Sequence, residues 1–89
     1  MVRKHIYFSG RVQGVGFRFQ AGWAAKRFGL TGWVKNLYDG RVEMEVQGDA
    51  DAIDGMLEAL TSDTYIRITD IDSVEIPLEE GERKFRTQY

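Results

Sequence analysis

The sequence predicts an α+β fold in which one antiparallel sheet carries two helices on one face. Apolar residues recur at every second position in several segments and at helical spacing in two others. These segments follow one another as strand, helix, strand, strand, helix, strand, with a short strand at the end. The chain has 89 residues, which leaves no room for a second core. We therefore expect residues 1–89 to form a single domain.

The first strand and the first helix are separated by a change of periodicity. Ile6, Phe8 and Val12 alternate with polar residues, which predicts a strand from Ile6 to Val12 with one buried face. After a glycine-rich break the apolar positions take helical spacing, and Gly29 stands where a left-handed C-terminal cap is expected. The apolar positions of this helix are Phe17, Ala21, Ala24, Ala25 and Phe28.

A hairpin follows the first helix. The segment from Thr31 to Tyr38 is rich in aromatic and β-branched residues, and Asp39-Gly40 is a strong turn signal. Beyond the turn, apolar residues alternate with charged or polar ones, which predicts a strand with one face in water. The apolar positions of this strand are Val42, Met44 and Val46.

The second helix begins after Asp49, which we expect to be its N-cap, and Asp51 adds negative charge to its first turn. Gly55 is expected to weaken this helix a little. Its apolar stripe consists of Ile53, Met56, Leu57 and Leu60.

Two further strands complete the chain. The apolar pattern from Ile66 to Ile76 slips once in phase, which predicts a bulge near residues 69–71, and Pro77 ends the strand. Alternation resumes in the last residues and predicts a short fifth strand. Its apolar or β-branched positions are Phe85, Thr87 and Tyr89.

This order of elements is the split β-α-β, or ferredoxin-like, arrangement. In it the first two strands run parallel, with the third strand between them, so their carboxyl ends lie at the same edge of the sheet. The topology therefore brings the loop from Gln13 to Arg18 close to Asn36, the residue that closes the second strand.

Composition narrows the possible functions. Without cysteine and with one histidine, the chain cannot form disulfides or thiolate sites, and we expect neither a metal nor a cofactor. The net charge of −2 argues against a nucleic-acid binder. No apolar run approaches the length of a membrane span and no signal-peptide pattern is present. We expect an unprocessed, soluble, cytoplasmic monomer.

The segment from Gly10 to Arg18 has the composition of an anion-binding loop. It passes from a strand through a glycine-containing turn to a helix N-terminus, where unpaired N–H groups and the helix dipole suit a phosphate or a carboxylate. Arg18 lies in the first helical turn and offers two hydrogen bonds to phosphate oxygens. A surface arginine after a tight turn is the alternative. The segment is neither a Walker A loop nor a dinucleotide-binding loop.

Other polar and aromatic residues have simpler interpretations. Asn36 suits a water-binding role, although it is also a typical turn-starting residue. His5 is placed on the polar phase of the first strand, away from the loop, so we assign it no catalytic role. Phe19 and Trp23 are expected to pack in the core or along the helix flank rather than to stack on a ligand. Residues 79–82 suggest a solvated acidic loop.

Taken together, these residues resemble the acylphosphatases. One signature of that family appears as Gly10-Arg11-Val12-Gln13-Gly14-Val15-Gly16-Phe17-Arg18, and the other as Gly29-Leu30-Thr31-Gly32-Trp33-Val34-Lys35-Asn36. The resemblance implies the ferredoxin-like fold and metal-independent hydrolysis of acyl phosphates to a carboxylate and inorganic phosphate. It implies that Arg18 binds the phosphate and that Asn36 orients the attacking water. The implied phosphate-binding loop consists of Gln13, Gly14, Val15, Gly16 and Phe17.

The presence of Gly16 resembles the microbial members of the family, and we expect a free-standing protein. Three other functions stay open at this point. One is a catalytically idle anion-binding or regulatory module on the same fold. Another is an RNA-binding module, although the third strand presents charged side chains where aromatic rings are needed. The last is a domain of a larger carbamoyl-phosphate-handling protein.

Overall fold

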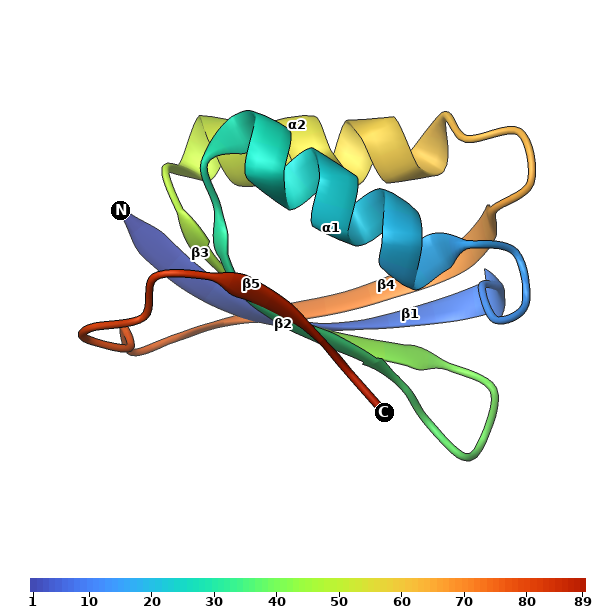
Figure 1. Ribbon diagram of the computed structural model, residues 1–89. Helices are drawn as coiled ribbons and strands as arrows, with labels where there is room; N and C mark the ends of the chain where they lie inside the picture. The colour runs from blue at the N-terminus through green and yellow to red at the C-terminus, as the bar shows by residue number, and fades with distance from the viewer.

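The computed structural model describes residues 1–89 and contains a five-stranded sheet covered on one face by two helices (Figure 1). The predicted fold class is confirmed. In chain order the elements are β1 (Val2–Arg11), α1 (Phe17–Phe28), β2 (Thr31–Asn36), β3 (Val42–Gly48), α2 (Ala50–Thr61), β4 (Arg67–Ile76) and β5 (Phe85–Gln88).

The strands lie in the order β4-β1-β3-β2-β5. β3 is antiparallel to both β1 and β2, so β1 and β2 are parallel and their carboxyl ends reach the same edge, as predicted. The sheet is not wholly antiparallel, because β5 pairs with β2 in parallel. The carboxyl end of β5 therefore arrives at that edge too, and Figure 1 shows the loop after β1, the β2–β3 turn and the C-terminus on one side of the molecule.

The core lies between the sheet and the helices. Alternate residues of the central strands face it, and the helices contribute the residues that periodicity predicted. Its largest fully buried side chains are Phe8, Phe17, Ile6, Met44, Ile53, Met56, Leu60, Val12, Val34, Val42 and Val46. Neither helix has the length and apolar composition needed to span a bilayer.

Several predicted boundaries shift. β1 begins at Val2 rather than Ile6, because its first residues pair with β3 on one side and β4 on the other despite their polarity. β2 ends at Asn36 rather than Tyr38, since the Leu37 N–H donates to the Arg41 carbonyl at 2.8 Å and closes the turn. The bulge is where the phase slip predicted it: Ser9 pairs with Asp70 and the next residue of β1 with Ile68.

The second helix begins after Asp49 as predicted, although the Asp49 side chain makes no capping hydrogen bond. Gly55 has a packing role between the two helices that its low helix propensity does not indicate. A Cβ atom at this position would lie 2.8 Å from the Phe28 ring of α1, so the missing side chain is what lets the two helices approach. The predicted weakness of the helix is thus linked to closer packing.

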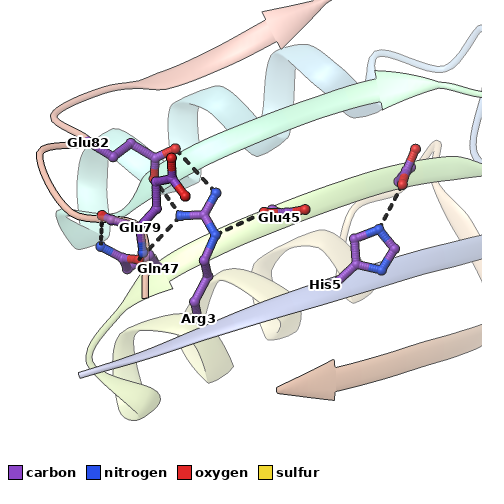
Figure 2. Close-up of polar contacts among 7 residues, drawn as sticks. Arg3, His5, Glu45, Gln47, Glu79 and Glu82 are labelled. Atoms are coloured by element: carbon purple, nitrogen blue, oxygen red, sulfur yellow. Dashed lines mark hydrogen bonds and ion pairs between the residues drawn. The ribbon is translucent and has the colours of Figure 1, made fainter. Parts of the chain in front are cut away.

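The loop after β4 is anchored to the sheet rather than solvated throughout (Figure 2). Arg3 is 3% exposed and binds Glu82 through Nη1 at 2.7 Å and Glu45 through Nε at 2.9 Å. Gln47 accepts from the Glu79 backbone N–H at 2.8 Å and donates to the Glu79 carbonyl at 3.2 Å. These contacts hold the chain in place just before β5 begins.

The Arg3–Glu82 pair makes stability dependent on acid. Burial raises the pKa of Glu82, but the hydrogen bonds from Arg3 and Thr31, together with the charges of Arg3 and Arg86, leave this pKa below its ordinary value. Because the native pKa is lowered, ionised Glu82 stabilises the fold at pH values above the ordinary pKa of a glutamate, about 4.3. This stabilisation is lost as pH falls through the native pKa.

We predict that Glu82→Gln lowers the free energy of unfolding at neutral pH and also reduces its further loss on acidification from about pH 6 to about pH 3. Urea denaturation at a series of pH values measures both effects. Glu80→Gln, an exposed neighbour, is the matched control and should retain the wild-type acid sensitivity. Equal acid sensitivity in wild type and Glu82→Gln would contradict this account of the ion pair.

Candidate functional site

The loop between β1 and α1 is shaped by two glycines in the left-handed region. Gly14 has φ 73° and Gly16, the N-cap of α1, has φ 80°, where a Cβ atom would be strained. Helical hydrogen bonding begins only when the Gln20 N–H donates to the Gly16 carbonyl at 2.9 Å. The backbone N–H groups of Gly14, Val15 and Gly16 donate to no group of the protein, so the loop offers several free donors.

Arg18 is held by the end of the chain's last strand. Its Nη1 atom donates to the Gln88 carbonyl at 3.3 Å, and its guanidinium lies 4.8 Å from the centre of the Tyr89 ring. Both contacts restrict the side chain while leaving most of its five N–H donors available. The arginine is therefore positioned by β5 rather than loose on the surface.

Asn36 is the last residue of β2, and its amide carries an unsatisfied acceptor. The Oδ1 atom is buried, and no donor of the protein reaches it. Native proteins pair the great majority of buried side-chain oxygens, so this unpaired oxygen marks Asn36 as a functional candidate.

These residues meet at an open cavity of about 320 Å³. Arg18 is the one charged side chain in its wall, so the cavity suits an anion. The helix N-terminus adds partial positive charge at the same place. The lining residues are Val12, Gly14, Gly16, Phe17, Arg18, Phe19, Asn36, Thr87 and Tyr89.

Residues 12–16, between β1 and α1, form what we call the glycine loop. The side chain of Gln13 connects this loop to the β2–β3 turn, and we call this connection the Gln13 brace. Its Nε2 atom donates to the Leu37 carbonyl at 2.7 Å and to the Arg41 carbonyl at 2.9 Å. Leu37 directly follows Asn36, so this one amide links the loop to the end of β2, where Asn36 lies.

Comparison with known proteins gives a consistent answer. The acylphosphatase family model matches residues 4–87. The chain is 40% identical to an acylphosphatase of Clostridium beijerinckii, with both sequences covered completely. It superposes on the crystal structure of an acylphosphatase from Bacillus subtilis with a TM-score of 0.91, at 39% identity and complete coverage of both chains.

The chain belongs to the acylphosphatase family. A similar fold also occurs inside a longer protein: the chain matches T. kodakarensis HypF with a TM-score of 0.85 and 35% identity, and this match covers 12% of the HypF chain. For the family as a whole, these likenesses support hydrolysis of acyl phosphates.

The family's expected site residues divide into two groups in this structure. Gly14, Gly16, Phe17, Arg18 and Asn36 line the cavity. The Gln13 side chain is instead used in the brace, and the half-buried Val15 packs against the core. His5 lies outside the cavity, within 2.7 Å of Glu43. No three His, Cys, Asp or Glu side chains are grouped in a way that would hold a metal ion.

Four residues of the cavity wall were not among the predicted site residues, namely Val12, Phe19, Thr87 and Tyr89. Neither Phe19 nor Trp23 packs in the core, because they are 72% and 62% exposed, and Trp23 lies on the flank between α1 and α2. The buried face of α1 is formed by Phe17 and the alanines, and these two rings project from other faces. Thr87 and Tyr89 were predicted to belong to a fifth strand, but the sequence did not indicate which strand it pairs with.

We predict that Gln13→Glu lowers the free energy of unfolding by about 2 kcal/mol, because two hydrogen bonds are lost and a carboxylate faces two carbonyl oxygens. Gln20→Glu, on the adjacent helix, should change it by less than about 0.5 kcal/mol. Chemical denaturation measures both values. Equal effects of the two substitutions would show that the brace contributes nothing.

Proposed function

We propose that this protein hydrolyses the bond between the carboxyl and phosphoryl groups of acyl phosphates, without a metal ion. The observation that carries the proposal is the meeting of Arg18, the glycine loop and Asn36 at one cavity. Membership of the acylphosphatase family supports the reaction class, and the geometry supports a role for each residue. We further propose that residues 1–89 act as one domain in this reaction.

The glycine loop and Arg18 bind the phosphoryl group. Backbone N–H groups from Gln13 to Phe17 surround its oxygens, and the Arg18 guanidinium donates two parallel hydrogen bonds. As charge redistributes over the phosphoryl oxygens in the transition state, these fixed donors stabilise it without reorganising. Loss of one such donor typically costs about 3–4 kcal/mol of transition-state stabilisation.

Asn36 orients the attacking water. Its side-chain amide hydrogen-bonds the water, which places the water oxygen in line with the phosphorus. The water oxygen bonds to phosphorus while the bond from phosphorus to the carboxyl oxygen breaks. The carboxylate departs with the electron pair of that bond, and the proton of the water passes to a phosphoryl oxygen, which gives inorganic phosphate.

The reaction is suited to so small a set of groups because the substrate is a mixed anhydride. A carboxylate is already a good leaving group, so neither a protein nucleophile nor a strong general acid is required. Positioning and charge stabilisation carry the catalysis. The substrate's own phosphate accepts the proton that a general base would otherwise take.

Two substitutions separate binding from turnover. Arg18→Ala should abolish measurable binding of inorganic phosphate and lower kcat/KM for acetyl phosphate by at least about 100-fold. Asn36→Ala should retain phosphate binding and lower kcat by a similar factor, because it removes only the group that orients the water. Steady-state assays in excess chelator, with phosphate binding measured by calorimetry, test both variants and the metal independence together.

Normal turnover by Arg18→Ala would contradict the proposal, as would loss of activity on adding chelator to the wild type. Phosphate binding by the wild type without hydrolysis of any acyl phosphate would favour the anion-binding or regulatory module instead. Inorganic phosphate should compete with substrate, since both occupy the same loop.

A further inference from the structure

Phe19 is an apolar ring in the wall of the cavity. It is 72% exposed and lines the same cavity as Arg18 and Asn36. It makes none of the ring–ring or cation–ring contacts found elsewhere in the molecule. Folding gains little from a phenyl ring left in water, and the place of this ring in the wall of the cavity that holds Arg18 makes it available for ligand contact.

The direction in which the acyl group of a bound substrate extends from the loop also indicates Phe19. A phosphoryl group held by Arg18 and the loop amides must extend its acyl group toward solvent. The exposed side chains in the cavity wall are Phe19, Thr87 and Tyr89. Tyr89 already faces the Arg18 guanidinium, which leaves Phe19 as the apolar surface free to contact the acyl group.

We propose that Phe19 is the residue that selects the acyl group, and that it favours acyl phosphates with a flat aromatic acyl group over those with a small one. This inference rests on the proposed function and adds the substrate class. An aromatic acyl group stacked against the Phe19 ring buries apolar area on both partners and gains the additional attraction of an aromatic pair. An acetyl group is too small to cover the ring.

Helix α1 supplies its own control. Trp23 lies one helical turn beyond Phe19 and is also exposed, yet it lines a separate groove of about 400 Å³ between α1 and α2. Substituting either residue by alanine removes an exposed aromatic ring from the same helix. Only the Phe19 substitution removes it from the cavity that holds Arg18.

The test compares benzoyl phosphate with acetyl phosphate in wild type, Phe19→Ala, Phe19→Tyr and Trp23→Ala. In Phe19→Ala the ratio of kcat/KM for benzoyl phosphate to that for acetyl phosphate should fall about five- to tenfold. Phe19→Tyr keeps a ring and should restore most of the ratio, while Trp23→Ala should keep the wild-type ratio and rates. A ratio unchanged in Phe19→Ala, or lowered equally in Trp23→Ala, would overturn the inference.

A binding measurement keeps this inference separate from the proposed function. Benzylphosphonate and ethylphosphonate cannot be hydrolysed in this way, and calorimetry gives their affinity ratio in the same four proteins. Loss of the preference for benzylphosphonate in Phe19→Ala alone supports the acyl-group contact even if the wild type hydrolyses neither acyl phosphate. That combination would contradict the proposed function and retain the role of Phe19 in binding, whereas no preference in the wild type would overturn the role of Phe19.

Discussion

The candidate site depends on the position of β3 between β1 and β2. Because β3 is antiparallel to both neighbours, the carboxyl ends of β1 and β2 must emerge at one edge of the sheet. The glycine loop follows the first of these ends and Asn36 occupies the second. If β3 did not lie between β1 and β2, the topology would not place the N–H donors of the loop next to the Asn36 amide. The Gln13 brace then sets their separation with two hydrogen bonds.

The parallel pairing of β5 with β2 places the end of the chain at the same cavity, beside the glycine loop and Asn36. It brings the Gln88 carbonyl and the Tyr89 ring against Arg18, so the arginine is positioned before a ligand arrives. The loop that leads to β5 is fixed in turn by the buried Arg3 guanidinium, whose pKa is raised chiefly by its hydrogen bond to Glu82. A polar network on one face of the sheet thereby supports a site at the sheet's edge.

The sequence predicted the features that depend on local pattern. Alternation and helical spacing gave the order of elements, and the phase slip located the bulge opposite Ser9. The convergence of the loop and Asn36 followed from topology alone. Contacts between distant residues were beyond such reasoning. Arg3 lies before the strand predicted from Ile6, and its partners, Glu45 and Glu82, are far along the chain. Phe19 was assigned to packing because spacing does not reveal which helical face is covered.

The site contains one charged side chain, one amide oxygen and a set of backbone donors, a set suited to an activated substrate. The glycine loop is the proposed phosphate-binding element. Titration of ¹⁵N-labelled protein with inorganic phosphate tests this assignment. We expect the largest amide shifts at Gly14, Val15, Gly16 and Phe17. Shifts concentrated instead in the basic segment around Arg83 and Lys84, or beside Trp23, would contradict it.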